Sequence, residues 1–494
     1  MSSGRALMVT LLCLFTQSGK ASMEITRQLS APTLHDGHSR SALLSQQATH
    51  ISLGDAVYLG LRNHRGIRSA YLQRVGQKFD LRVAKDAFSP KLLLKGHYTD
   101  NQGSEDRARK TSLSPSVSLL GEYGTRLSVS WTRQLNDAER AGRFRGDGLE
   151  MTLIQPLLRG AGRDVSTAPL RLEQLKEQAN RLNLKTSVSQ AIVDIITTYR
   201  ELLRSQEQLA IVQEALRRTR SLLDVNKALI TAGRMAEFEI VQTEAEIAVQ
   251  EMDVEEAQNQ VHISRLDLLR LLALDLSTPL HASEVLEAFR ITIDQPEALR
   301  LAQIQQPQYL SMLLGSHQAD LNLLIAKDQA RWDVSLVAGA TQIHGRYDNG
   351  IGSGRNWDSY AGVQLEIPIG ALSTRQAEIH AHINLQTQEI NLADARQELE
   401  RDVNNAVREL GTRWRQYEIA QRATELSRRK LEIEQEKLNA GRSSNFQIIS
   451  FESDLRNAEN ARLSALISYL NAQTQLDLTL GMTLESWEIA LNDV

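Results

Sequence analysis

The chain has 494 residues and a formal net charge of −4, with acidic and basic residues interspersed along its length. This charge balance gives no basis for nucleic-acid binding. With only 9 prolines, 5% aromatic residues and long runs of Gln, Glu, Arg, Ala and Leu, the composition indicates extended helices and coiled coils rather than a set of compact domains.

The first 22 residues have the composition of an export signal. Arg5 precedes an apolar run over residues 6–15, and small residues that suit a cleavage site follow at Gly19, Ala21 and Ser22. The run is too short to span a bilayer as a helix. We therefore predict a signal peptide over residues 1–22, with a disordered start as the alternative.

The next segment, residues 23–50, is polar and mixed, and it predicts a flexible N-terminal arm. The only cysteine, Cys13, lies inside the apolar run, and Leu12 before it argues against a lipoprotein signal. The mature chain would then have no disulfide and no cysteine-based metal site. No later segment supplies the ~20 apolar residues of a membrane-spanning helix, although the strands of a β-barrel would leave only weak signals.

Residues 51–276 predict a first repeat that begins with helices and passes into strands. Ser52 is a suitable N-cap for a helix over residues 52–63, and a second helix over 66–87 ends at Ser89-Pro90. From about residue 89 to 157, apolar and polar residues alternate as in strands, and glycine and charged residues predict loops at 101–103, 122–124 and 138–148. Pro156 ends the strands where helical periodicity resumes.

A heptad pattern dominates residues 165–230. Its regular spacing predicts a supercoiled helix packed along one seam, whose members are Ile195, Leu202, Leu209, Leu216, Leu223 and Ile230. A break at Gly233 separates this helix from a return helix that reaches about residue 276. A helix of ~65 residues is about 100 Å long, a length that suits crossing a wide space.

The second half of the chain repeats the first. The tripeptide at Gly233 recurs 208 residues later at Gly441, and the surrounding positions match as Ala232, Arg234, Phe238, Ile240 and Glu244 against Ala440, Arg442, Phe446, Ile448 and Glu452. After a linker over 277–296, the second repeat (297–484) predicts strands at about 333–369 that end near Pro368. A long helix over 372–439 follows, then a last helix over 445–480 and a tail over 485–494. The long helix keeps the seam of the first half, with Thr424 as its one lapse, through Val403, Leu410, Tyr417, Leu431 and Leu438. The first repeat carries extra strand-and-loop material at about 113–143.

This order resembles the outer membrane efflux protein family typified by TolC. The resemblance covers residues 51–484, and its motifs are residues 52–63, Gln155-Pro156, Ile367-Pro368 and the tips at Gly233 and Gly441. It implies an α+β membrane protein of two tandem repeats. Three protomers would share one outer-membrane β-barrel, four strands from each, and continue it as a coiled-coil α-helical tunnel through the periplasm of a Gram-negative bacterium.

The same resemblance implies the partners and the activity. The tunnel would dock on an inner-membrane pump through a periplasmic adaptor (membrane fusion) protein and serve as the exit duct for efflux or type I secretion. The sequence itself shows no nucleophile with a base and no metal cluster, so we predict no cofactor and no enzymatic activity. The residues agree independently, because too few strands exist in one protomer to close a barrel and a membrane sheet cannot leave open edges. Trp131, Trp332 and Trp357 lie in or beside the strand regions, as aromatic residues do at membrane interfaces.

The resemblance places the periplasmic gate and the adaptor-docking surface at the two tips. Gly233 and Gly441 suit left-handed turns and by themselves only reverse the chain. In the family, acidic residues that lie one turn past the glycine form rings that narrow the entrance. A ring of like charge selects solutes by the sign of their charge. Glu239 matches this position in the first half, whereas the second-half positions Gln447 and Ser450 are neutral, which departs from an acidic ring. The remaining tip residues of this prediction are Arg234, Phe238, Arg442 and Phe446.

The two tip arginines could pair with acidic residues and hold the entrance closed. At exposed sites each such pair contributes only about 0–1 kcal/mol, so several would have to break together.

Catalytic and metal-binding patterns are weak. Gly160-Ala161-Gly162 lacks the third glycine of a dinucleotide fingerprint and the surrounding βαβ unit. His380 and His382 are two apart on a helix and face different sides, and Arg145-Gly146-Asp147 is assigned to a loop. Two other classes stay open: a periplasmic adaptor, which usually has one helical hairpin, and a purely structural coiled coil. Two hairpins, strands and the duplication argue against both.

Overall fold

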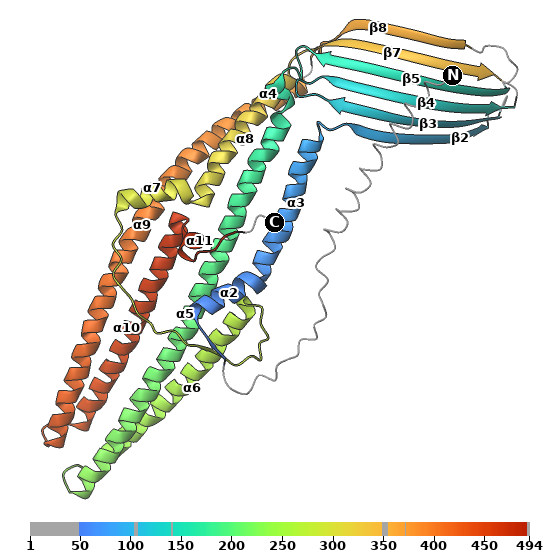
Figure 1. Ribbon diagram of the computed structural model, residues 1–494. Coiled ribbons are helices and arrows are strands. Elements are labelled where there is room, and N and C mark those ends of the chain that lie inside the picture. Colours follow the sequence, from blue (N-terminus) through green and yellow to red (C-terminus); the bar gives the residue numbers. More distant parts are fainter. Residues whose placement is uncertain (1–48, 103–106, 140–141, 348–353, 371, 492–494) are drawn as a thin grey trace. The chain divides into compact units, whose positions relative to one another are not determined.

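The computed structural model describes residues 49–102, 107–139, 142–347, 354–370 and 372–491 (Figure 1). The predicted signal peptide and residues 23–48 of the predicted arm lie outside this part. Contacts divide the chain into two units, residues 1–50 with Pro279–His281, and Ile51–Thr278 with Ala282–Val494. In the first unit the Thr49 amide donates to the Pro279 carbonyl at 2.7 Å, within the pairing of two short strands, β1 (Thr49–Ile51) and β6 (Leu280–Ala282). Sequence analysis predicts neither strand.

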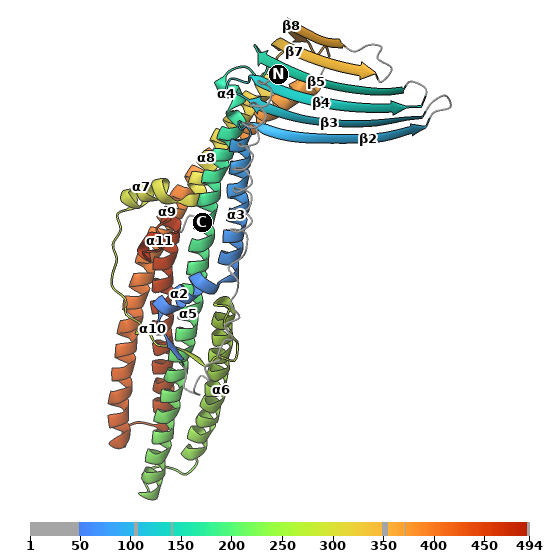
Figure 2. The ribbon, with the colours of Figure 1, turned by 45° about the vertical axis from the view of Figure 1, so that its right-hand side comes forward.

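The second unit contains ten described helices. Their bounds are α2 Leu53–Asn63, α3 Arg65–Asp86, α4 Arg163–Ser166, α5 Ala168–Thr231, α6 Glu239–Leu271, α7 Gln295–Gln305, α8 Pro307–Gln329, α9 Leu372–Asn439, α10 Asn445–Leu480 and α11 Thr483–Ser486. Helix α5 has 64 residues and α9 has 68, so each is about 100 Å long. Helix α5 lies against α6, and α9 against α10, as two hairpins that remain side by side in both views (Figures 1 and 2). None of the helices in the described ranges is both long and apolar enough to cross a membrane.

Local chemistry sets the helix ends. Ser52 caps α2 as predicted, and it forms a capping box with Asp55. The return helix α6 ends at Leu271 instead of the predicted residue 276. The helix stops there because the chain turns: Ala273 has a φ of 52°, and the Leu274 amide donates a hydrogen bond to the Leu269 carbonyl at 2.9 Å.

The strands form one six-stranded antiparallel sheet in the order β2-β3-β4-β5-β7-β8 (Figure 1). Their bounds are β2 Lys91–Gln102, β3 Arg107–Leu120, β4 Arg126–Ala138, β5 Gly142–Pro156, β7 Asp333–Tyr347 and β8 Gly354–Glu366. The four strands per protomer implied by the resemblance are therefore wrong for this chain. The additional pair, β3 and β4, occupies the region where sequence analysis predicts extra material.

The loop predicted at residues 138–148 is also wrong over most of its length. Strand β5 begins at Gly142, and Gly146 pairs with Gln134 of β4 and Gly345 of β7. Arg145-Gly146-Asp147 thus lies in a strand rather than a loop. Glycine and charged residues predict a loop when read singly, but here hydrogen bonds to neighbouring strands on both sides hold them extended.

The sheet has one apolar and one polar face. Cross-strand pairs such as Val117↔Val129 and Val129↔Met151 align the apolar positions, and Ser116↔Ser130 aligns polar ones. The apolar face continues over all six strands through Leu92, Leu94, Leu113, Val117, Leu119, Leu127, Val129, Trp131, Leu149, Met151, Leu153, Leu336, Trp357, Val363 and Leu365. Most of these side chains are at least one-third exposed, so the described residues leave this face open.

The turn between β3 and β4 packs against the strand-to-helix turn before α4. The Gly162 amide donates to the Tyr123 carbonyl at 3.4 Å, and the Ser166 hydroxyl donates to the Gly121 carbonyl at 3.3 Å. Arg163 pairs with Glu122 at 3.1 Å. At Gly124, with a φ of +86°, a Cβ would collide with the Gly160 carbonyl. The additional hairpin is therefore fixed at the helical end of the sheet.

The predicted helical seam is buried over most of its length. Val403, Leu410, Leu431 and Leu438 are at most 3% exposed. Thr424, expected as a lapse, is also buried, and its hydroxyl lies 2.9 Å from the Ala458 carbonyl of α10. It therefore belongs to the seam, because a hydrogen bond satisfies its polar atom. On α5, Ile195, Leu202 and Leu216 are buried as predicted.

Near the tip, burial on α5 shifts from Leu223 and Ile230, which are half-buried, to Thr219, Leu222 and Asn226. A straight helix drifts relative to a strict seven-residue repeat, which explains the shift.

Candidate functional site at the hairpin tips

Both tips are built by the same backbone turn. Gly233 has a φ of +70° and Gly441 a φ of +71°. In the first tip the Gly233 amide donates to the Ile230 carbonyl and the Arg234 amide to the Leu229 carbonyl, both at 2.8 Å. In the second, the Gly441 and Arg442 amides donate to the Leu438 and Lys437 carbonyls at 2.9 and 2.8 Å. These are two Schellman motifs, and both need a residue that adopts positive φ without strain.

The helices that leave the tips begin differently. Ser444 caps α10, and its hydroxyl accepts a hydrogen bond from the Gln447 amide at 3.3 Å. The N-cap residue of α6 is Phe238, whose side chain makes no capping hydrogen bond. Helix α6 therefore starts six residues after Gly233, whereas α10 starts four residues after Gly441.

A buried polar cluster joins the two hairpins at their tips. This tip cluster consists of Asn226 on α5, Thr243 on α6 and Asn445 on α10, each fully buried. The Asn226 amide group donates to the Asn445 side-chain oxygen at 2.8 Å and to the Thr243 hydroxyl at 2.9 Å. The Asn445 amide group donates to the Thr243 hydroxyl at 2.9 Å and to the Glu239 carbonyl at 3.3 Å. Because the cluster connects residues of both repeats, parting the tips would break it.

A group of charged residues continues this connection away from the tips. Arg218 of α5 donates a hydrogen bond to Glu452 of α10 at 2.8 Å and lies 3.9 Å from Glu459 of the same helix. Glu459 also accepts a hydrogen bond from Arg428 of α9 at 2.9 Å. Glu452 is only 4% exposed. Burial raises the pKa of the Glu452 carboxyl, and the hydrogen bond from Arg218 opposes that shift.

A further ion pair between the hairpins joins Arg456 of α10 to Asp253 of α6 at 2.7 Å.

The second tip holds an acidic residue that the repeat comparison does not find. Glu434 on α9 is 5% exposed and accepts a hydrogen bond from the Ser443 hydroxyl at 2.6 Å. Its other partner is Lys437, at 3.0 Å. The Ser443 hydroxyl and then Lys437 lower the pKa of the Glu434 carboxyl. This carboxylate is engaged within the protomer, unlike a ring residue that faces a passage.

The predicted gate residues lie at the tips with different exposure. Glu239 is the first residue of α6 and is half-buried, Ser450 is half-buried and Gln447 is exposed. Arg234 and Arg442 are exposed, and neither makes an ion pair with any residue in the described part of the protomer. The side chains of Phe238 and Phe446 are 74% and 65% exposed.

The predicted strand-to-helix prolines lie at the other end of the helices. Pro156 is the last residue of β5 and pairs with Ser335. Pro368 lies between β8 and α9.

The tip cluster and Arg218 are the residues that sequence reasoning misses. Asn226 and Thr219 fall on the buried side of α5, and a polar residue at a buried helical position is the signal that could have drawn attention to them. The α10 partners of Asn226 and Arg218 lie more than 200 residues away in the sequence. The periodicity of a single sequence does not reveal which residues of different helices pair with each other.

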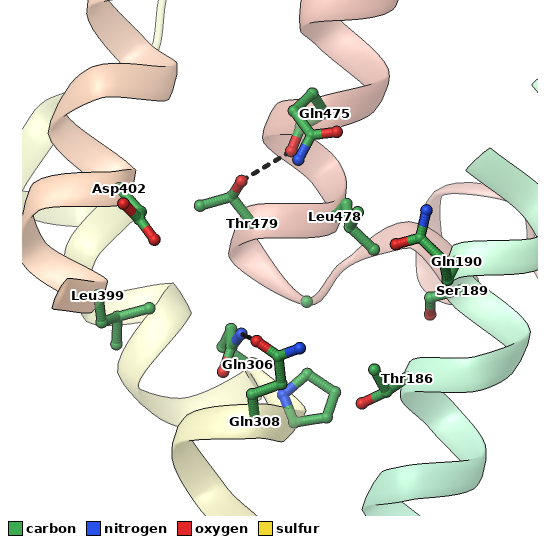
Figure 3. A pocket seen from close by; sticks show the side chains of 12 residues that line it. Thr186, Ser189, Gln190, Gln306, Gln308, Leu399, Asp402, Gln475, Leu478 and Thr479 are labelled. Atoms are coloured by element: carbon green, nitrogen blue, oxygen red, sulfur yellow. Dashed lines mark hydrogen bonds between the residues drawn. The ribbon is translucent and has the colours of Figure 1, made fainter. Parts of the chain in front are cut away.

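A polar cavity of about 250 Å³ lies away from the tips, between α5, α8, α9 and α10 (Figure 3). Its lining is rich in Gln, Ser and Thr, and Asp402 is its only ionisable lining residue. Arg401 donates to Asp402 at 2.9 Å. The lining offers no nucleophile beside a base, and no group of three or more His, Cys, Asp or Glu residues that could hold a metal ion occurs among the described residues.

The chain has the fold of solved outer membrane channels. The Vibrio cholerae outer membrane protein VceC matches with a TM-score of 0.66 at 15% identity, over 87% of this chain and 96% of that one. The Neisseria gonorrhoeae MtrE outer membrane channel in its open state matches with a TM-score of 0.64 at 16% identity, over 87% and 88%. The Campylobacter jejuni CmeC outer membrane channel matches with a TM-score of 0.63 at 16% identity, over 87% and 86%.

No protein-family model matches the sequence. No curated protein matches it either. The mixed helix-and-sheet fold expected from the TolC-type resemblance is thus confirmed by structure, at a level of sequence identity that carries the fold alone. The trimer, the closed barrel and the tandem repeats stay predictions.

Proposed function

We propose that this chain is the protomer of a trimeric outer membrane channel that serves as the exit duct of a tripartite efflux or type I secretion system in a Gram-negative bacterium. Its sheet would cross the outer membrane, and its helical hairpins would extend into the periplasm. The partners would be a periplasmic adaptor protein and an inner-membrane pump. The pump would select the cargo, and the duct would pass it on without chemistry.

The exposed apolar face of the sheet is the observation that carries this proposal. A water-soluble adaptor or coiled coil would have to cover a face of this size, because soluble proteins rarely expose apolar patches above a few hundred Å². The strands have 12 to 15 residues, and a tilted strand needs about 9–11 to cross the hydrocarbon core. Tyr98, Trp131 and Trp357 lie on this face, where barrels place interfacial aromatic residues.

The two open edges of the sheet support assembly. Within the described residues, β2 pairs only with β3 and β8 only with β7. Unpaired backbone groups cost several kcal/mol each in hydrocarbon, so both edges need partners there. Identical copies related by a threefold axis would supply them, with β2 of one copy beside β8 of the next.

The tips would form the periplasmic entrance and the docking end. The tip cluster holds the two hairpins of each protomer together, and the exposed Phe238 and Phe446 offer apolar anchors for an adaptor. Arg234 and Arg442 have no acidic partner within the described protomer, so their pairing would be with neighbouring copies around the entrance. Glu239 would be the acidic residue that such a ring contributes.

Cell fractionation of the full-length protein tests the proposal. We expect it in the outer membrane fraction, released only by detergent, with a mass of three chains. Purified trimers in planar bilayers should give small openings that widen when Arg234 or Arg442 is replaced by alanine. A soluble periplasmic monomer would contradict the proposal and favour the adaptor.

Photo-crosslinking in cells tests the docking end. A crosslinker at Phe238 or Phe446 should capture an adaptor protein. The control is Leu72, which is 74% exposed on α3. Equal capture from Leu72 would count against a docking role of the tips.

A further inference from the structure

The additional strand pair β3–β4 changes the size of the barrel that a trimer would form. We infer that β3 and β4 are part of the barrel wall, so that three copies close an eighteen-stranded barrel and not a twelve-stranded one. This inference rests on the proposed trimeric channel and goes beyond it, because it fixes the strand number and width of the exit.

Hydrogen bonding places the additional strands inside the continuous sheet. Strand β3 pairs with β2 from Lys91↔Ser118 to Gln102↔Arg107, and β4 pairs with β5 from Arg126↔Ile154 to Ala138↔Gly142. Removing the pair would leave β2 and β5 as direct neighbours, the arrangement expected of a four-stranded protomer. Here β3 and β4 separate them over the full length of both strands.

The side chains of the additional strands follow the same two-faced pattern as their neighbours. On β3 the apolar face carries Leu113, Pro115, Val117 and Leu119, and the polar face carries Ser112, Ser114, Ser116 and Ser118. On β4 the apolar face carries Leu127, Val129, Trp131 and Leu135, with Arg133 as the one charged residue between them, and the polar face carries Ser128, Ser130, Thr132 and Gln134. The Ser114 and Thr132 hydroxyls lie 3.0 Å apart on the polar face. A hairpin standing in water outside the membrane has no need of a continuous apolar face, whereas a barrel wall has lipid on one side and water on the other.

The helical end of the pair is fixed where the sheet meets the helices. The turn at residues 121–125 bonds through Tyr123 to Gly162, just before α4, and through Gly121 to Ser166 of α4, as described above. The pair therefore starts level with the other strands. The lengths of β3 and β4, 14 and 13 residues, lie between those of β2 and β5, 12 and 15 residues.

The added strands widen the barrel considerably. With strands ~4.8 Å apart and tilted by ~40°, twelve strands give a barrel about 24 Å across and eighteen give about 36 Å, measured between backbones. Barrels of 16–18 strands leave an open aqueous channel. The exit would then be wider than in a trimer whose protomers contribute four strands each, and it would suit bulkier cargo.

Cysteine labelling tests the position of the additional pair. In a Cys13→Ser background, which removes the only native cysteine, single cysteines are placed on the polar face (Ser116→Cys, Ser130→Cys) and on the apolar face (Val117→Cys, Val129→Cys). A membrane-impermeant maleimide is added to the trimer in lipid vesicles. We expect the polar-face positions to label at least tenfold faster than the apolar-face positions, because lipid covers the latter.

Matched positions on β5 separate this inference from the proposed function. Thr152→Cys lies on the polar face and Met151→Cys on the apolar face of a strand that belongs to the barrel in either case. If β5 alternates but β3 and β4 label equally on both faces, the eighteen-stranded barrel is wrong and the channel stands. If β5 does not alternate either, the membrane barrel itself is wrong. Electron cryomicroscopy of the trimer then counts the strands, and a ring of twelve would overturn the inference.

Discussion

Replacement of Asn445 by alanine is the sharpest test of the tip cluster. The side chain of Asn445 makes three hydrogen bonds, at 2.8 Å with Asn226, 2.9 Å with Thr243 and 3.3 Å with the Glu239 carbonyl. A typical hydrogen bond contributes about 1 kcal/mol net, so Asn445→Ala should weaken the connection between the hairpins by about 2–4 kcal/mol in each protomer. Alanine is well tolerated at the start of α10, where Ser444 keeps the helix cap.

The effect should appear in the opening of the entrance. If opening parts the two hairpins, a loss of 2–4 kcal/mol raises the ratio of open to closed tips by a factor of about 30 to 700 per protomer. Single-channel recording of trimers in planar bilayers measures this as open time and conductance. Asn457→Ala is the matched control, because Asn457 is also an asparagine of α10 but is exposed and lies outside the tip cluster.

Two outcomes would contradict a role of the tip cluster in closing the entrance. An intact Asn445→Ala trimer with the open time of the control would show that the cluster does not hold the entrance closed. Asn226→Ala removes the same 2.8 Å bond from the other side. The double variant should therefore be less perturbed than the sum of the single variants, and strict additivity would show that the two asparagines do not act together.

Three further predictions concern stability, measured as the temperature at which the detergent-solubilised trimer dissociates or unfolds. Burial raises the pKa of Glu452 in the folded protein above its ordinary value of 4.5. The free energy of unfolding should therefore fall as pH rises from 4.5 to this raised pKa, because the unfolded chain ionises first. Glu452→Gln should remove that loss and be at least as stable as the native protein at neutral pH; a marked loss there would contradict the sign. Glu177→Ala should lower the free energy of unfolding by about 3–5 kcal/mol, because the Glu177 carboxylate accepts hydrogen bonds from the guanidinium of Arg74, which is 2% exposed. A loss below about 1 kcal/mol would refute this prediction. Gly124→Ala should destabilise more than Gly142→Ala. Both glycines have positive φ, which costs alanine about 1–2 kcal/mol, but only at Gly124 does a Cβ meet the backbone of Gly160. Equal effects would show that the β3–β4 turn does not pack there.

Periodicity in the sequence predicts the helices and both tips well. The seven-residue spacing identifies α5 and α9, and Gly233 and Gly441 mark the turns because few other residues adopt positive φ. Helix ends are predicted less well where a residue other than glycine stops the helix, as Ala273 does after α6.

The strand region is harder to predict from a single chain. Serine residues on β3 alternate with apolar ones, but alternation alone does not show that the pair lies between β2 and β5. The segment at 142–148 is extended only because β4 and β7 flank it. Pairings across the repeats, such as Arg218 with Glu452, depend on how the hairpins pack, and no local pattern contains that information.

The turns at Gly233 and Gly441 also bear on how freely the surface of the tips can vary. Each turn is closed by main-chain hydrogen bonds and one glycine. The side chains at Arg234 and Arg442 consequently have no share in closing the turn. Substitutions there can alter the surface shown to another protein without a penalty in folding. Sequence variation at these two positions can therefore change the surface of the tip while the turn itself stays the same.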